Sequence, residues 1–143
     1  MIIVENIISE KFDAGVLAKD AVRLTWEGRR KCRQRLTTTG GREIGLALPT
    51  GTTLHPGDVL YRNEKFEIVV EGEPEKVLVI RPQTSRAFGI ACYQIGNLHR
   101  PIGFHGGAIL IPYEPVLENQ LDRLGFQYSI EELVFTHAAA RCH

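Results

Sequence analysis

The order of strand and helix signals after residue 75 constrains the fold of this chain more than any other feature of its sequence. An uninterrupted apolar run at residues 77–80 predicts a buried strand. Thr84 or Ser85 can then cap a helix whose broad apolar face continues to Ile95, and Gly96 predicts a left-handed stop. The second half of the chain therefore begins with a strand followed by a helix.

The rest of this half repeats the alternation. Two short strands are expected at residues 102–104 and 108–111, and Pro115 favours a second helix as its first residue. Gly125 ends that helix, and alternating apolar residues predict a last strand at residues 126–130. The resulting order, βαββαβ, is that of a ferredoxin-like unit.

The first half of the chain is dominated by strand patterns. Apolar and polar residues alternate at 22–26, 44–48 and 66–70, and turn residues separate these runs. Gly40-Gly41 suits a hairpin. We therefore expect a small, mostly antiparallel β domain, which makes the fold class of the whole chain α+β.

A short charged segment with glycine and proline, at residues 72–75, marks the boundary between the two halves. The predicted organisation is a β-rich domain at residues 1–73, a ferredoxin-like domain at residues 74–135 and a flexible C-terminal tail at residues 136–143.

Charge and cysteine content exclude several classes of function. Lys plus Arg and Asp plus Glu both number 17, so the chain has no general attraction for nucleic acid or anionic membranes. Three cysteines without paired spacing favour neither a disulfide framework nor a zinc ribbon. The N-terminus lacks the pattern of a signal peptide, and no apolar run approaches the roughly 20 residues of a membrane-spanning helix. We expect a cytoplasmic protein without nucleic-acid or membrane partners.

His99 is the first candidate metal ligand. It lies in the loop that leaves the first predicted helix, with no other His, Cys, Asp or Glu within five positions. One imidazole does not hold a metal ion tightly, but a two-fold axis brings a second copy of the same residue opposite the first. His99 therefore predicts a dimer with metal on its axis, and the alternative is a loop histidine satisfied by backbone contacts.

Three further candidate ligands, His137, Cys142 and His143, crowd the final seven residues. On a mobile tail they could close over an ion at the axis, and a site with few and mobile ligands suits a carrier that must release its cargo. A frayed terminus with incidental histidines is the alternative. Because histidine binds metal when deprotonated, affinity should fall as the pH drops through about 6.5.

The remaining histidines and cysteines carry less weight. His105 is an accessory ligand or a turn residue, His55 belongs to a turn of the first half, and Cys92 lies on the apolar helix face as a small core residue. The chain has no glycine-rich phosphate loop, HExxH pair or GxSxG elbow. Cys142 beside His143 lacks the rigid support that a nucleophile needs, so we do not expect an enzyme.

A basic stretch in the first half carries an interaction hypothesis. Strand periodicity would place Arg29, Lys31, Arg33 and Arg35 on one face. Such a stripe could dock an acidic protein surface or a phosphate backbone, and the alternative is a solvated edge that discourages aggregation.

Three segments in a fixed order give the chain a family resemblance. Residues 36–51 read LTTTGGREIGLALPTG, residues 57–60 read GDVL, and residues 91–101 read ACYQIGNLHRP. With this joint pattern the chain resembles the UreE family of urease accessory proteins over nearly its whole length.

The resemblance implies an N-terminal domain of peptide-binding type, a ferredoxin-like metal-binding domain, and a homodimer with His99 at its interface. It also implies a nickel metallochaperone that delivers Ni(II) to apo-urease with the UreG GTPase and the other accessory proteins. The family's C-terminal histidines point to His143 and His137 as tail ligands.

Departures from the family limit the expected metal capacity. Many members carry histidine where this chain has Gln94, some carry histidines where it has Tyr113 and Pro115, and several end in a long histidine-rich tail. We therefore expect about one tightly held ion per dimer. The choice between a dimer and a metal-bridged tetramer stays open, as does the choice between nickel, zinc and copper.

Two other functions remain as alternatives. One is a metal-independent adaptor in urease assembly that holds its partner through the basic stretch from Arg29 to Arg35. The other is a general zinc- or copper-binding protein.

Overall fold

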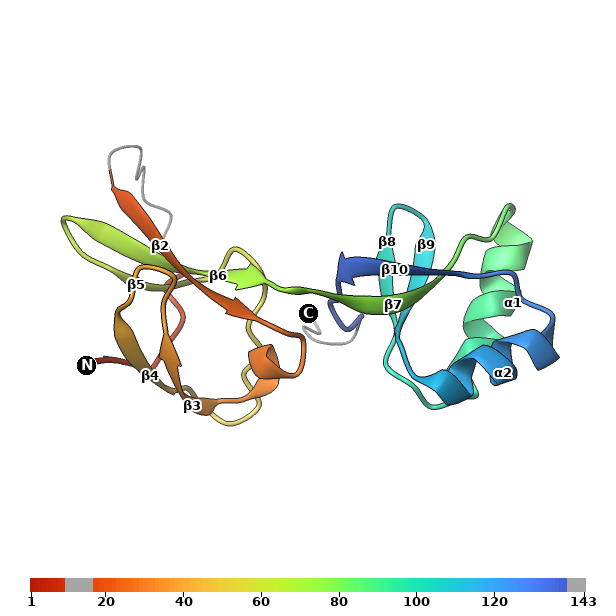
Figure 1. The fold of residues 1–143 in the computed structure, drawn as a ribbon, viewed down its shortest axis with the longest axis horizontal. Coiled ribbons are helices and arrows are strands. Elements are labelled where there is room, and N and C mark those ends of the chain that lie inside the picture. The colour runs from red at the N-terminus through yellow and green to blue at the C-terminus, as the bar shows by residue number, and fades with distance from the viewer. Residues whose placement is uncertain (10–16, 139–143) are drawn as a thin grey trace. The chain divides into compact units, whose positions relative to one another are not determined.

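The computed structural model describes residues 1–9 and 17–138. The chain divides into two compact units, Met1–Glu73 and Pro74–His143, each with its own core (Figure 1). The division falls next to Pro74, within the short charged segment that contains little to bury.

The first unit consists of two three-stranded sheets. One sheet has the order β1 (Ile2–Val4), β4 (Glu43–Ala47), β3 (Arg33–Thr37), and the other has the order β2 (Ala18–Leu24), β6 (Phe66–Gly72), β5 (Val59–Arg62). In the first sheet β3 and β4 are antiparallel, and β1 pairs in parallel with β4. In the second sheet β5 and β6 are antiparallel, and β2 pairs in parallel with β6. The expectation of a mostly antiparallel domain is therefore wrong in this respect, because alternation predicts strands but not their partners.

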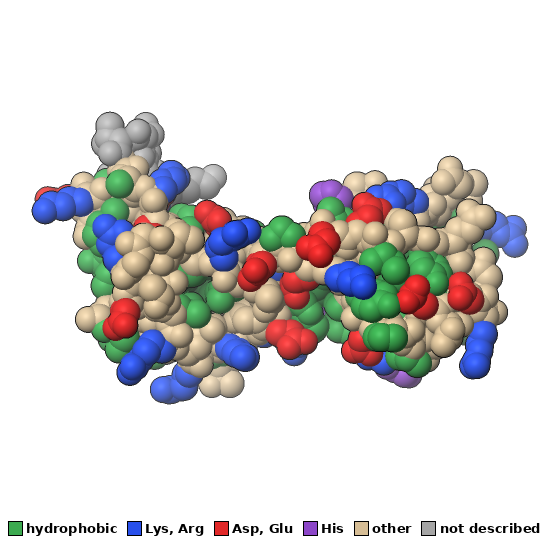
Figure 2. Space-filling model, viewed as in Figure 1, with side chains coloured by type: hydrophobic (Ala, Val, Ile, Leu, Met, Phe, Trp, Pro, Cys, Tyr) green, Lys and Arg blue, Asp and Glu red, His purple; other side chains and the backbone are tan. Residues whose placement is uncertain are grey.

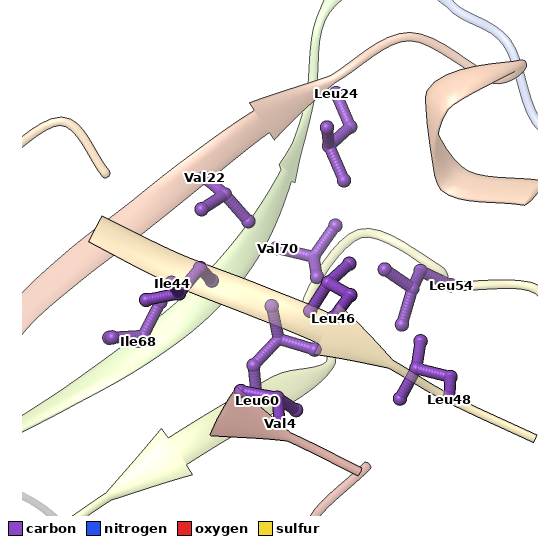
Figure 3. Packing of buried hydrophobic residues seen from close by; sticks show 10 residues of the cluster. All are labelled: Val4, Val22, Leu24, Ile44, Leu46, Leu48, Leu54, Leu60, Ile68 and Val70. Carbon is purple, nitrogen blue, oxygen red and sulfur yellow. The ribbon is translucent and has the colours of Figure 1, made fainter. Parts of the chain in front are cut away.

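Both sheets supply the core of the first unit. Figure 3 shows ten side chains from the two sheets and the loops between them, packed together in one cluster. Ile44, Leu54 and Ile68 are completely buried. The alternating residues of both sheets thus bury one face each, as in a two-layer β structure.

The basic stretch is not one continuous strand. Gly28–Arg30 form a 3₁₀-helix, stabilised at its start by the Gly28 N–H, which donates to the Thr25 hydroxyl over 3.1 Å. Arg29 is buried in this turn, and its carbonyl accepts from the Leu54 N–H over 2.8 Å. The predicted four-cation face is therefore wrong for Arg29, and the exposed cations that share strand periodicity are Lys31, Arg33 and Arg35.

The second unit has the predicted βαββαβ order. Its elements are β7 (Pro74–Ile80), α1 (Ser85–Gly96), β8 (Gly103–His105), β9 (Ala108–Pro112), α2 (Pro115–Leu124) and β10 (Ser129–Val134). The sheet order is β10-β7-β9-β8, with all neighbouring pairs antiparallel. This is the strand arrangement of a ferredoxin-like fold, so the predicted α+β fold class is confirmed.

The helix signals are confirmed with one exception. The Thr84 hydroxyl accepts from the Ala87 N–H over 3.0 Å, Pro115 begins α2, and Gly125 caps it with a φ of 80°. Gly96, however, is the last residue of α1, and the left-handed residue that follows is His99, with a φ of 55°. The helix therefore ends at Gly96 as predicted, but the left-handed conformation predicted for Gly96 is wrong.

The last strand begins later than its apolar alternation predicted. Phe126 and Tyr128 are half-buried and pack against the core between the helices and the sheet. Pairing with β7 starts at Ser129, which lies opposite Val79. Alternation alone did not distinguish residues of the connection from residues of the strand.

The helices cover one face of the second sheet. Leu78, Ile80, Ile109 and Ile111 point to this face and form a core with residues of α1 and α2. Acidic and basic side chains are intermixed on the view in Figure 2, in keeping with the zero net charge. Among the residues that the structure describes, no helix is long and apolar enough to cross a membrane.

Candidate metal centre

His99 owes its position to the way α1 ends. The Asn97 N–H donates to the Tyr93 carbonyl over 3.3 Å, and the His99 N–H donates to the Gly96 carbonyl over 3.1 Å. The chain then turns through His99 in the left-handed region, which costs about 1 kcal/mol for a residue with a Cβ. The imidazole is thereby exposed at the helix end rather than drawn into the core.

The residues on either side of His99 are anchored. Leu98 and Ile102 are half-buried and pack against the core of the second unit. The Arg100 guanidinium lies 2.6 Å from the Glu114 carboxylate, which ties the loop to the start of α2. An exposed imidazole on a backbone fixed at both sides is well suited to bind a ligand from solution or from another chain.

His137 lies in the segment that follows β10. It is half-buried and takes part in an interaction of its own. The next residue, Ala138, donates its N–H to the Ile102 carbonyl over 2.7 Å. The residue after His137 is thus hydrogen-bonded to Ile102, which follows His99 by three positions in the sequence.

The other two predicted ligands, Cys142 and His143, lie outside the described residues. They follow Ala138 by four and five positions.

The remaining candidates belong to other parts of the chain. His105 is exposed at the end of β8, next to the Gly106-Gly107 turn. His55 belongs to a turn of the first unit, where its backbone N–H donates to the Asp58 carboxylate over 2.7 Å. Cys92 is half-buried against the core, and burial raises the pKa of its thiol, which favours the protonated form that binds metal poorly.

Within residues 1–9 and 17–138, no three His, Cys, Asp or Glu side chains gather into a group that could hold a metal ion. A tight transition-metal site needs about four donors. If His99 binds metal tightly, it needs donors from outside the described residues of one chain, such as the last residues of the chain or a second copy of it.

Sequence reasoning missed the contact between residues 136–138 and the sheet. The predicted flexible tail began at residue 136, yet the Ala138 N–H bonds to Ile102 and the Thr136 carbonyl lies against Gly103. Residues 136–138 form neither a helix nor a strand, so no hydrophobic periodicity marks them in the sequence. Gly103 was the available hint, since a glycine within a strand often marks a close approach of another backbone.

Family comparisons agree with this division of the chain. The family model for the "UreE urease accessory protein, N-terminal domain" matches residues 3–72, and that for the "C-terminal domain" matches residues 75–141. The chain belongs to the UreE family of urease accessory proteins. The resemblance inferred from the sequence motifs is therefore confirmed.

Individual UreE proteins match over most of both chains. The urease accessory protein UreE of Synechococcus sp. (strain JA-3-3Ab) is 44% identical over 102 residues, which are 71% of this chain and 68% of the relative. UreE of Deinococcus radiodurans is 40% identical over 114 residues, covering 80% of this chain and 74% of the relative. UreE of Staphylococcus carnosus is 38% identical over 99 residues, covering 69% and 66%.

Proposed function

We propose that this chain is a nickel-binding metallochaperone of urease maturation that holds Ni(II) at the interface of a homodimer. The observation that carries the proposal is the exposed His99 imidazole on an anchored loop. Among the described residues, no three His, Cys, Asp or Glu side chains form a group that could hold a metal ion. Pairing with its symmetry mate doubles the donors without any further residue type.

Exposed apolar side chains support self-association near His99. On α1, Ile90 is 47% exposed and Tyr93 is 73% exposed, and on β8 Phe104 is 52% exposed. Phe104 packs against Phe88 of α1, with ring centroids 5.8 Å apart. Exposed apolar side chains on the helix before His99 and on the strand after it favour a contact between two copies of this chain.

The tail completes the proposed site. His143 and His137 are the expected nitrogen donors and Cys142 a further donor, and together with the two copies of His99 they would hold about one ion per dimer. Imidazole donors suit nickel and also accept zinc or copper, so those metals are expected to substitute.

The proposed role is that of a carrier rather than an enzyme. The chain would work in the cytoplasm and pass its nickel to the urease apoprotein together with the UreG GTPase and the other accessory proteins. Residues 74–135 would form the metal-binding domain, and residues 1–73 a domain of peptide-binding type.

Replacing the ligand tests this proposal. His99→Ala should abolish high-affinity nickel binding in calorimetry, while circular dichroism and the dimer measured by native mass spectrometry remain unchanged. His105→Ala is the matched control, because it removes an exposed histidine of the same unit that is not assigned a ligand role. Unchanged nickel affinity in His99→Ala would overturn the proposal.

Shortening the tail tests its share of the site. Truncation after Ala140 removes Cys142 and His143 and should weaken nickel binding without eliminating it, since His99 and its symmetry mate remain. An affinity equal to that of the full chain would show that these two residues take no part.

A second candidate function is a metal-independent adaptor. Lys31, Arg33 and Arg35 are exposed, and among the described residues none of the three forms an ion pair. Arg33→Glu with Arg35→Glu should then impair capture of the urease apoprotein and leave nickel binding intact. Retained capture would identify these cations as a solvated edge.

A further inference from the structure

β3 is an edge strand of its sheet. The sheet order is β1-β4-β3, so β3 pairs with β4 on one side only. Just before β3, the Cys32 carbonyl accepts from the Leu48 N–H over 2.9 Å, and just after it, the Thr38 N–H donates to the Arg42 carbonyl over 2.7 Å. Both bonds join even-numbered residues in the register of the β3–β4 pair. The even-numbered residues of β3 therefore form the hydrogen bonds to β4.

The odd-numbered residues of β3 turn their backbone groups outward. Hydrogen-bonded and non-hydrogen-bonded pairs alternate along an antiparallel ladder, so the N–H and C=O groups of Arg33, Arg35 and Thr37 point away from β4. Within the described part of the chain, no other group forms a hydrogen bond with them. This edge is therefore open for pairing with another strand.

The side chains at the same positions bring positive charge to the outer face of the sheet. Arg33 and Arg35 lie opposite Ala47 and Gly45 of β4, which carry no charge. Both arginines are exposed, and neither forms an ion pair with a described residue. The one acidic residue of β4, Glu43, lies opposite the last residue of β3 instead. The edge thus presents two unpaired cations, about 7 Å apart along the strand.

This charge selects the occupant of the edge. Side chains directly opposite each other in a strand pair lie about 4.5–5.5 Å apart, where like charges destabilise the pair and opposite charges stabilise it. A second copy of β3 would place arginine beside arginine, so this edge does not favour pairing with itself. A strand with a carboxylate at every second residue would place its carboxylates beside both arginines and also bond to the outward N–H and C=O groups.

We propose that the free edge of β3 binds an extended acidic segment of a partner protein, which joins the sheet as a further strand with its carboxylates beside Arg33 and Arg35. In such strand addition, main-chain hydrogen bonds hold the segment and alternate side chains select it. The inference gives the metal-independent candidate function a mode of binding, and it does not rest on nickel binding at His99.

Hydrogen exchange by NMR tests where a segment binds. The probe is a short synthetic peptide in which glutamate and threonine alternate, added to the full chain. The amides of Arg33 and Arg35 should exchange rapidly without peptide and at least about ten-fold more slowly with it, while those of Gln34 and Leu36 should be protected throughout. Unchanged exchange at Arg33 and Arg35 in excess peptide would overturn the inference.

Charge variants test the selection of acidic residues. With peptide affinity measured by fluorescence anisotropy, Arg35→Glu should weaken binding at least about ten-fold. Lys65→Glu is the matched control, because it makes the same charge change at an exposed residue between β5 and β6, and it should stay within about two-fold of the parent chain. An equal loss in both variants would indicate general charge attraction and overturn the inference.

Methylated peptides test the backbone pairing. Only every second N–H of an added strand faces β3, so N-methylation at either the glutamates or the threonines should abolish binding while methylation of the other set is tolerated. Full affinity of both methylated peptides would overturn the inference, as would equal affinity for a single-stranded DNA oligonucleotide, which would indicate a phosphate site. None of these results bears on nickel binding, which His99→Ala tests separately.

Discussion

The buried carboxylate of Asp20 offers a test of how the first unit is held together. Its side chain is 2% exposed and accepts hydrogen bonds from the next β-hairpin: the Thr38 hydroxyl at 2.6 Å, the Arg42 guanidinium at 2.7 Å and the Gly40 N–H at 2.8 Å. Asp20 lies on β2, whereas the hairpin joins β3 to β4 of the other sheet. This carboxylate therefore links the two sheets.

Asp20→Asn keeps the shape and removes the charge. An amide can accept on one of the two atoms only, so its nitrogen must face either Arg42 or the backbone N–H groups of Gly40 and Ala21. One charge-assisted hydrogen bond contributes about 1.5–3 kcal/mol. Because Arg42 is 41% exposed and regains contact with water, we expect a loss of about 2 kcal/mol in the free energy of unfolding.

The loss should depend on pH. Burial acts to raise the pKa of Asp20, but the hydrogen bonds from Thr38, Arg42, Gly40 and Ala21 outweigh it and hold the pKa well below its ordinary value. Because the pKa of Asp20 is lower in the folded than in the unfolded state, its ionised carboxylate stabilises the folded state at pH values above the unfolded pKa of about 3.9. This stabilisation is lost as the pH falls toward the folded-state pKa. The difference between the two proteins should therefore be full at pH 7 and shrink below about pH 4.

Urea denaturation followed by the fluorescence of Trp26 measures this difference. Trp26 is the single tryptophan of the chain and belongs to the first unit, so its signal reports that unit. Glu43→Gln is the matched control, since Glu43 is an exposed carboxylate on β4, and it should change stability by less than about 0.5 kcal/mol. A loss below about 0.5 kcal/mol for Asp20→Asn at pH 7, or one that is the same at pH 7 and pH 3, would refute the reasoning.

Two further predictions concern the second unit. Gly125→Ala places a Cβ in a left-handed backbone with a φ of 80° and should destabilise the unit by about 1 kcal/mol in urea denaturation followed by far-UV circular dichroism, whereas Gly89→Ala in α1 should not destabilise it. The Arg81 guanidinium contacts both carboxylate oxygens of Glu131, at 2.7 and 3.2 Å, and with the Ser129 hydroxyl it lowers the pKa of that carboxyl to about 2. NMR titration of the Glu131 carboxyl group should give this low pKa in the parent chain and a pKa that returns toward about 4.3 in Arg81→Met. An ordinary pKa for Glu131 in the parent chain would contradict the ion pair.

Much of the second unit could be predicted from the sequence because its signals are local. Thr84, Pro115 and Gly125 act through bonds and dihedral angles within one turn of their own helix. Once both helices and their flanking strands are identified, few topologies bury all the apolar faces, and the βαββαβ order selects one of them. The family motifs added the expected metal function.

The same contrast between local signals and tertiary structure applies to the candidate site. The sequence identified His99 as an isolated ligand type, and its exposure on the loop after α1 agrees with that interpretation. It also predicted a left-handed residue at Gly96; α1 does end there, but the left-handed residue is His99. Cys142 and His143 lie outside the described residues, so their part in the site remains a prediction.

The sequence by itself determined the helices, most strands, the α+β class and the family, because each of these depends on periodicity, caps or motifs that are complete within a short stretch of chain. The tertiary structure alone decided that β1 and β2 run parallel to their partners, that Arg29 is buried, and that Ala138 bonds to Ile102. These features join residues far apart in the sequence. Neither partner carries a local mark of the other, and the pairing follows from how the assembled sheets pack.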